Sequence, residues 1–227
     1  EAAAHAASPQ VRHRATLGGN LAQHTRCGYY RLLSFPCWKR GADACPVLAD
    51  GAVQDTAGIF GNAACASGHP ASLPPVLGAA RATVVVRTAA GVERRPFETL
   101  WAAPQRGVAS DLALAPGDLI EAVETPLGAD LVAYEEVRQK AAFDWALVSS
   151  AVGLTRDAAG KVASAAVWLG SVAPTPHRAS AAEAALVGQA LAGAGFDAAI
   201  EAAAEAATAG ATPLPGNAFK VDLVRVV

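Results

Sequence analysis

The sequence contains no methionine, even at its first position, and no apolar run approaches the length of a membrane-spanning helix. A bilayer requires about 20 consecutive apolar residues, so no membrane span is expected. A translated chain starts with methionine, and the opening stretch EAAAHAASPQ has the composition of a helix already under way. We therefore expect further sequence upstream of Glu1, where any signal peptide would also lie, so the sequence leaves the cellular compartment open.

The chain also lacks a strong charge of either sign. Its 227 residues include 18 Lys and Arg and 20 Asp and Glu, which gives a net charge of -2 with the basic residues scattered. This balance provides no electrostatic basis for binding nucleic acid or a membrane surface. Because 52% of the residues are hydrophobic and 17% are charged, a sizeable core can form in one large domain or two small ones.

An irregular stretch at residues 24–68 divides the chain. Before it, residues 1–8 have a helical pattern that Pro9 is expected to end, and VRHRATLGGN has the character of a glycine-rich turn. Residues 24–68 show little helix or strand periodicity, yet they contain all four cysteines and many glycines. A stretch of this length without regular structure is usually functional or bound to something.

Regular structure resumes after this stretch, and a second unit is expected to start near Asp130. Trp145 and Trp168 are expected to pack on a sheet, Ser180 with Glu183 fits a capping box, and Asn217 fits an N-cap. The last helix runs to the end of the sequence, so we expect the natural chain to continue. The pattern predicts a helix at 73–80, strands at 83–87, 92–95, 119–125 and 131–137, long strands at 144–156 and 161–173 joined by a turn, and helices at 179–189, 197–208 and 218–227.

The four cysteines are spaced C-x9-C-x7-C-x19-C, at Cys27, Cys37, Cys45 and Cys65. Two disulfides would require an oxidising compartment, and a chain with this much core does not need them. A zinc site usually uses close pairs such as C-x2-C, which are absent here. Four thiolates suit a [4Fe–4S] cluster, and the glycines of the loop leave the backbone free to wrap around it. The spacing favours the cluster and leaves all three interpretations open.

A second informative segment is Ala15-Thr16-Leu17-Gly18-Gly19-Asn20. Paired glycines let the backbone approach a ligand closely, and the Thr hydroxyl and Asn amide add directed hydrogen bonds. Alone, Gly-Gly-Asn is more often a simple turn than a ligand site.

Together these segments resemble a known family. SPQVRHRATLGGNLAQHTRCGYYR, followed by FPCWKRG, ACPVL, IFG, a cysteine and HP, is similar to the FAD-binding (medium) subunit of molybdenum hydroxylases of the xanthine, aldehyde and CO dehydrogenase type. The resemblance is strongest to the aldehyde oxidoreductase branch that carries an extra [4Fe–4S] cluster. YEEVRQKAAFDWALVSSAVGL and LGSVAPTPHRASAAE resemble the family's C-terminal flavoprotein domain, so the resemblance covers almost the whole chain.

The resemblance implies an α+β fold with two parts. Residues 1–126 would be part of an FAD-binding module with its iron–sulfur loop at 24–68, and residues 130–227 would be the C-terminal flavoprotein domain with an antiparallel sheet and helices. A first flavin loop would lie upstream of Glu1. The residues implied for FAD are Thr16, Leu17, Gly18, Gly19, Asn20, Ser72, Leu119 and Ile120, and those implied for the cluster are Cys27, Cys37, Cys45 and Cys65.

The implied function is electron transfer, with no catalytic residue in this chain. Electrons would come from a molybdenum-cofactor subunit and a [2Fe–2S] subunit, reach FAD here, and leave to an external acceptor. Relatives usually read His-Pro-Ser-Asp after the last cysteine, whereas this chain reads His69-Pro70-Ala71-Ser72, so Ser72 stands in the place of the Asp. A second departure is Glu136, where relatives often have Lys. The other open function is a non-enzymatic metal-binding or disulfide-stabilised module.

Several further residues near the cysteines have two interpretations each. His69 could be a metal ligand, but a capping or packing role before Pro70 fits better, because four thiolates already complete a cluster. The basic residues of the loop either offset the negative charge of a cluster or form its solvated rim. They are Arg26, Arg31, Lys39 and Arg40.

Overall fold

The computed structural model describes residues 1–126, 131–141 and 143–227, which form two antiparallel sheets flanked by helices. This mixed arrangement confirms the α+β class predicted from the sequence. The expected start of the second unit at Asp130 lies outside the described residues.

The strands expected from the sequence are all present, with boundaries shifted by a few residues. They are β1 (Thr83–Thr88), β2 (Gly91–Pro96), β3 (Leu119–Glu124), β4 (Leu131–Arg138), β5 (Ala146–Arg156) and β6 (Val162–Gly170), and a short β7 (His177–Arg178) joins them. The smaller sheet has the order β2-β1-β3 and the larger has β4-β5-β6-β7.

The helices lie before, between and after the two sheets. They are α1 (Ala2–His5), α2 (Pro9–Arg12), α3 (Leu17–Leu21), α4 (Gly28–Arg31), α5 (Pro74–Ala79), α6 (Ser180–Leu186), α7 (Ala194–Ala206) and α8 (Phe219–Val226), with short 3-10 turns η1 (Trp38–Arg40), η2 (Pro46–Leu48) and η3 (Phe97–Leu100). Within the described ranges, no helix is both long and apolar enough to cross a membrane.

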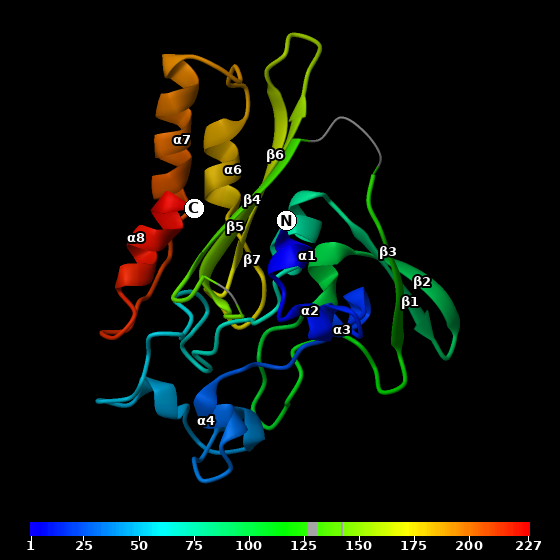
Figure 1. Ribbon diagram of the computed structural model, residues 1–227, viewed down its shortest axis with the longest axis vertical. Coiled ribbons are helices and arrows are strands. Elements are labelled where there is room, and N and C mark those ends of the chain that lie inside the picture. Colours follow the sequence, from blue (N-terminus) through cyan, green and yellow to red (C-terminus); the bar gives the residue numbers. More distant parts are fainter. Residues whose placement is uncertain (127–130, 142) are drawn as a thin grey trace.

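The hairpin of β5 and β6 lies at the centre of the molecule, with α6, α7 and α8 on one side and the smaller sheet on the other (Figure 1). Successive side chains of a strand point to opposite faces, and on β6 both faces are apolar and buried. Val167 and Leu169 pack against the C-terminal helices, whereas Ala166 and Trp168 pack toward α5 and the smaller sheet. Burial on both faces explains why β6 is almost continuously apolar in sequence.

Two glycines allow α5 to lie directly on this hairpin. A Cβ on Gly78 would come within 2.5 Å of the Trp168 ring, and a Cβ on Gly153 would come within 2.0 Å of the Ala79 carbonyl oxygen. Atoms cannot approach so closely, so any side chain at either position would push α5 away from the sheet. Trp168 thus packs on the sheet as expected, and its ring also meets Phe97 edge-on at 5.9 Å.

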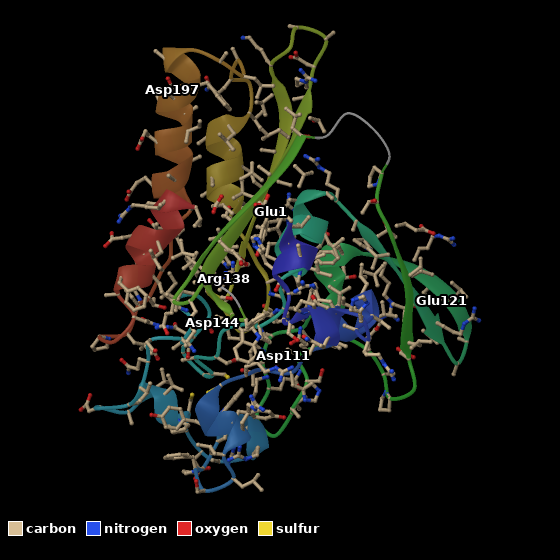
Figure 2. The ribbon with its side chains drawn as sticks, in the orientation of Figure 1. Glu1, Asp111, Glu121, Arg138, Asp144 and Asp197 are labelled. Carbon is tan, nitrogen blue, oxygen red and sulfur yellow. The ribbon has the colours of Figure 1, made fainter. Side chains whose placement is uncertain are left out.

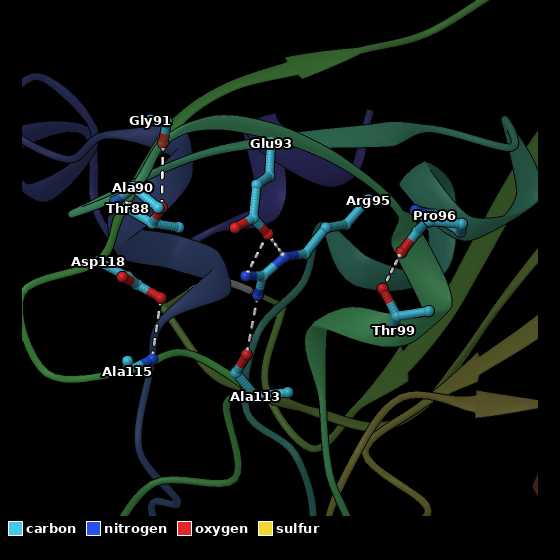
Figure 3. Close-up of polar contacts among 10 residues, drawn as sticks. All are labelled: Thr88, Ala90, Gly91, Glu93, Arg95, Pro96, Thr99, Ala113, Ala115 and Asp118. Carbon is cyan, nitrogen blue, oxygen red and sulfur yellow. Dashed lines mark hydrogen bonds and ion pairs between the residues drawn. The ribbon is translucent and has the colours of Figure 1, made fainter.

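Polar contacts fix the β1–β2 turn and the outer strand of the smaller sheet (Figure 3). Thr88 Oγ1 donates to the Gly91 carbonyl at 3.1 Å and closes the β1–β2 turn. Arg95 pairs with Glu93 and donates to the Ala113 carbonyl at 3.1 Å. The last bond ties the segment between η3 and β3 to the sheet.

The N-terminal region contains more helix than the sequence predicted. Pro9 begins α2 instead of ending a helix, because proline fits the first helical position, where its missing N–H is not needed. Ser8 caps this helix by accepting from Val11 N at 3.4 Å. The expected turn at Leu17-Gly18-Gly19-Asn20 is the short helix α3, which Thr16 caps.

Residues 24–68 form a lobe, here called the cysteine lobe, that projects from the two sheets and contains only α4, η1 and η2 (Figure 1). Arg40 organises the part next to α4, because its guanidinium donates to the carbonyls of Tyr29 (3.2 Å), Tyr30, Leu32 (3.1 Å) and Phe35. The lobe therefore holds its path through side chain to backbone bonds in place of regular structure.

The C-terminal connector ties the cysteine lobe to the larger sheet, and Asn217 is the main link. Its amide donates to the Ala57 and Gly58 carbonyls at 3.1 and 3.2 Å, and its oxygen accepts from Leu214 N at 2.7 Å. The prediction that Asn217 caps the last helix was therefore wrong, since this fully buried side chain joins two segments far apart in sequence.

Two further buried amides repeat this link. Asn62 donates to the Thr212 carbonyl at 2.8 Å, and Gln54 Oε1 accepts from Gly216 N at 2.9 Å.

The capping box predicted for Ser180 and Glu183 was also wrong. Glu183 instead accepts from Val167 N at 3.0 Å and pairs with Arg178, so it fixes the edge of β6.

Replacement of Asn217 by Ala should lower the free energy of unfolding by about 2 to 4 kcal/mol, because it leaves the buried Ala57 carbonyl and the Leu214 N–H without partners and removes one of the two donors to the Gly58 carbonyl. Denaturant titration measures the change, and Gln105→Ala at an exposed site is the matched control. An Asn217→Ala variant as stable as the control would show that the connector does not hold the lobe.

Candidate functional site

The glycine turn is fixed by contacts on both sides. Thr16 Oγ1 accepts from Gly19 N at 3.0 Å, and Asn20 Oδ1 accepts from Leu73 N at 3.3 Å, next to Ser72. A Cβ on Gly18 would lie 3.3 Å from the Ile120 carbonyl oxygen, so the turn approaches β3 closely. The fold thus brings together segments around residues 18, 72 and 120 that the resemblance had associated with one ligand.

A cavity of about 620 Å³, here called the turn cavity, opens beside this turn. Thr16, Gly19, Asn20 and Ser72 line it. Gly18 and Ile120 contact each other at the turn, and Leu17 and Leu119 are 41% and 60% exposed. Four of the eight residues expected near FAD therefore share one cavity.

The turn cavity also contains charged residues that the sequence had not associated with FAD. Arg12, Arg14 and Arg26 line it, with Asp144 as the acidic counterpart. Arg12 is held in place by the Ala6 and Ala7 carbonyls at 3.0 and 2.8 Å. The sequence signals for this basic wall were the VRHR segment just before the turn and Arg26, which had been considered only as a neighbour of the cysteines. An excess of positive charge suits a ligand that carries phosphate.

All four cysteines are free thiols, three of them buried and Cys27 partly buried. A hydrogen bond from the Cys45 thiol lowers the pKa of Cys65, as does one with Ser67, whose oxygen lies 3.4 Å from the Cys65 sulfur. Burial raises the pKa of Cys27, and the charges of Cys65 and Cys37 raise it further. The structure contains no disulfide among these cysteines, which it describes in full.

The four thiols lie near one another in the lobe, but they are not arranged as the ligands of a single metal ion. In the part of the chain that the structure describes, no three His, Cys, Asp or Glu side chains form a group able to hold one metal ion. Cys45 packs with Val47, Ala57 and Ala66 in the small core of the lobe, and Cys27 packs at its edge.

Lys39 places a buried positive charge within the cysteine lobe. Its side chain is 1% exposed and pairs with Asp111. Burial raises the pKa of Asp111 despite this pairing, and the Lys39 charge lowers the pKa of Cys65. The basic residues of the loop were expected either to offset the negative charge of a cluster or to form a solvated rim. Because Lys39 is buried inside the lobe, its position fits the role of offsetting negative charge.

A second cavity of about 510 Å³, here called the lobe cavity, lies between the cysteine lobe and the larger sheet. Cys27, Tyr29 and His69 line it, and most of the other lining residues are apolar. It shares Arg26, Pro70, Asp144 and Trp145 with the turn cavity, so the two spaces have a common wall. Figure 2 shows Asp144 and Asp111 where the lobe meets the sheets.

The common wall corrects the prediction that Trp145 packs on the sheet. The Trp145 side chain is about half exposed, and the Arg26 guanidinium lies 5.6 Å from its ring centre. Arg26 directly precedes Cys27, so the wall connects the glycine turn to the cysteines.

Glu136, the other departure from the family, is buried on β4. Its carboxylate pairs with Arg138 at 2.9 Å and accepts from the Tyr134 hydroxyl at 2.5 Å. His5 Nδ1 is 3.0 Å away, in ion-pair range but without hydrogen-bond geometry. The buried charge is thus compensated, and it fixes α1 against the larger sheet.

Comparison with known proteins identifies two family domains in the chain. The family model described as "FAD binding domain in molybdopterin dehydrogenase" matches residues 1–128, and the one described as "CO dehydrogenase flavoprotein C-terminal domain" matches residues 132–227. The FAD-binding subunit PaoB of the Escherichia coli K12 aldehyde oxidoreductase is 35% identical over 183 residues. That alignment covers 79% of this chain and 56% of PaoB, so the chain spans about half the length of this relative.

Solved structures show the same fold. A CO dehydrogenase from Hydrogenophaga pseudoflava is similar over 97% of this chain and 58% of its own, with a TM-score of 0.61 and 25% identity. A quinoline 2-oxidoreductase from Pseudomonas putida 86 is similar over 98% of this chain and 61% of its own, with a TM-score of 0.63 and 23% identity. The second similarity concerns the fold alone.

The stability of the chain should fall in mild acid because of His69. Burial, aided by the Lys39 charge, lowers the pKa of His69 from 6.5 to about 4. Between these values the unfolded chain binds a proton that the folded chain does not, so unfolding becomes easier as pH falls. The loss from pH 6.5 to 4 should amount to about 3 kcal/mol.

Denaturant titrations across this pH range measure the effect. A His69→Gln variant cannot titrate, so its stability should depend less on pH, whereas His13→Gln at an exposed site should leave the dependence unchanged. Equal pH dependence in the natural chain and the His69→Gln variant would contradict the prediction.

Proposed function

Because the chain belongs to the family of FAD-binding subunits of molybdenum hydroxylases, we propose that it holds FAD and passes electrons within a molybdenum-dependent oxidoreductase. The observation that carries this proposal is the turn cavity, in which Thr16, Gly19, Asn20 and Ser72 meet a basic wall. The relationship to an aldehyde oxidoreductase subunit favours the aldehyde type over the xanthine type.

The residues of the turn cavity fit an FAD diphosphate. Gly18 and Gly19 leave the backbone accessible, and the Asn20 amide keeps its NH₂ as a donor while its oxygen binds Leu73 N. Arg12 and Arg14 supply the positive charge that a diphosphate requires. In this proposal Thr16, Leu17, Gly18, Gly19, Asn20, Ser72, Leu119 and Ile120 hold or border the flavin, and the chain has no catalytic residue of its own.

The cysteine lobe is proposed to hold a [4Fe–4S] cluster through Cys27, Cys37, Cys45 and Cys65. Its support is the presence of four free thiols in one lobe, together with the buried Lys39, whose charge offsets that of anionic sulfur. Residues 1–126 are proposed to be part of the FAD-binding module, with its iron–sulfur loop at 24–68, and residues from 130 onward the C-terminal flavoprotein domain.

The proposed partners follow from the family. A molybdenum-cofactor subunit would oxidise the substrate, a [2Fe–2S] subunit would deliver the electrons, and an external acceptor would receive them. FAD supplies the redox chemistry when it is bound, and the residues of this chain bind it, orient it and keep water from it.

A Gly19→Val substitution should abolish or strongly reduce FAD binding. The Cβ would lie 3.1 Å from Thr16 Oγ1, and the remaining side chain would enter the turn cavity. Flavin content per subunit of the assembled enzyme measures the loss. Gly195→Val in α7, where a Cβ has open space, is the matched control and should keep its flavin. Full flavin content in Gly19→Val would remove the turn from the binding site.

The assembled enzyme should contain about four irons and four sulfides in addition to those of the [2Fe–2S] subunit, and these belong to the cysteine lobe. Cys45→Ser should lose them, whereas Val53→Ser in the same lobe, at a largely exposed residue, should retain them. Metal and sulfide analysis of the assembled enzyme decides the outcome. Zinc, or two disulfides in place of iron, would refute the cluster and leave the FAD proposal standing.

A further inference from the structure

Arg26 borders both cavities, and two contacts fix its guanidinium. One N–H donates to the Gln23 side-chain oxygen at 3.2 Å, and the guanidinium carbon lies over the Trp145 ring, 5.6 Å from its centre. A cation at this distance is attracted by the π electrons of the ring. The guanidinium therefore has a defined position at the wall that the turn cavity shares with the lobe cavity.

Gln23 ties this position to the glycine turn. Its amide nitrogen donates to the Asn20 carbonyl at 3.3 Å, and its oxygen accepts from Arg26, so the amide bridges the turn and the guanidinium. Gln23 and Asn20 both line the turn cavity. The turn beside which the FAD diphosphate is proposed to bind thus also sets where the Arg26 charge lies.

The Arg26 charge has no carboxylate partner within the described part of the chain. Asp144 lines the same wall, yet no ion pair joins it to Arg26. A guanidinium has five N–H donors, and Gln23 accepts from one of the terminal nitrogens only. Arg26 is thus a cation with a fixed position and unused donors, and such a group suits an anionic ligand.

We propose that Arg26 binds FAD by donating to an oxygen of its diphosphate, and that Gln23 and Trp145 are positioning residues for this contact. The inference rests on the proposed FAD site and adds to it a residue from the start of the cysteine lobe. A planar guanidinium can donate to a phosphate while it stays over the indole ring. Arg12 and Arg14 line the turn cavity alone, so Arg26 places a third positive charge on the side that borders the lobe cavity.

The test measures the Kd for FAD of the assembled enzyme after its own FAD has been removed, by titration followed through flavin fluorescence. Arg26→Gln removes the charge, whereas Arg26→Lys keeps the charge and loses the planar set of donors. Trp145→Leu removes the ring next to the guanidinium, and Trp145→Phe keeps a ring there. Arg31→Gln in α4 is the matched control, because this exposed arginine of the cysteine lobe lines neither cavity.

Arg26→Gln should weaken FAD binding about 10- to 100-fold, because a hydrogen bond between charged groups is lost. Its Kd should also depend less on salt concentration than that of the natural enzyme, a change that a purely structural defect would not cause. Arg26→Lys should fall between the two. Trp145→Leu should weaken binding about 2- to 5-fold, and Trp145→Phe should recover most of this loss. The control should bind FAD as the natural enzyme does.

An Arg26→Gln enzyme with natural affinity for FAD would overturn the role of Arg26 and leave the proposed FAD site standing. An equal loss in Arg26→Gln and Arg31→Gln would overturn it too, since the effect would then come from overall charge. If Arg26→Gln does not assemble, natural affinity in both Arg26→Lys and Trp145→Leu would overturn the proposal. A natural enzyme that contains and binds no FAD would instead refute the proposed function.

Discussion

The double-sided burial of the β5–β6 hairpin is the constraint on which the rest of the structure depends. One face packs against the C-terminal helices and the other packs against α5 and the smaller sheet. Each of the two hydrophobic cores therefore depends on the hairpin for part of its contacts. The ends of the hairpin also set the cavity walls. Trp145 immediately precedes β5, and Ser171, which lines the lobe cavity, immediately follows β6. The position of the site is therefore fixed by the packing of the sheet.

The cysteine lobe is held by a different kind of interaction. Its apolar core is small, and its path is determined by directional bonds from Arg40, Asn62 and Asn217 and by the buried pair of Lys39 with Asp111. Buried ion pairs contribute little net stability because desolvation offsets their attraction. Lys39 and Asp111 therefore serve mainly to specify one path of the loop and to place a positive charge near the thiols.

The strands could be predicted because β-branched runs and turn residues act locally, as at Thr83–Thr88. Glu183 and Asn217 were misassigned because each fits a local helix-capping rule, and only distant partners decide between that rule and its alternatives. Pro9 was misassigned because proline can either end a helix or occupy its first position, and Ser8 favours the second role. The gathering of Thr16, Gly19, Asn20 and Ser72 followed from family resemblance. The basic wall could not be predicted, because charge spacing in VRHR does not say which cavity the side chains enter.

Backbone strain explains why the walls of the two cavities could not be predicted from local sequence preferences. Four described residues other than glycine have a left-handed backbone, and three of them line these cavities: Ala7 (φ 49°) and Phe143 (φ 60°) the turn cavity, and Ser171 (φ 62°) the lobe cavity. Such residues cost on the order of 1 kcal/mol each and persist only where the surrounding contacts impose them. Lys220 on α8 donates to the Ser171 carbonyl at 3.0 Å, so the last helix holds this strained corner. The walls of the site thus follow from tertiary contacts that oppose local preference, which a sequence pattern cannot reveal.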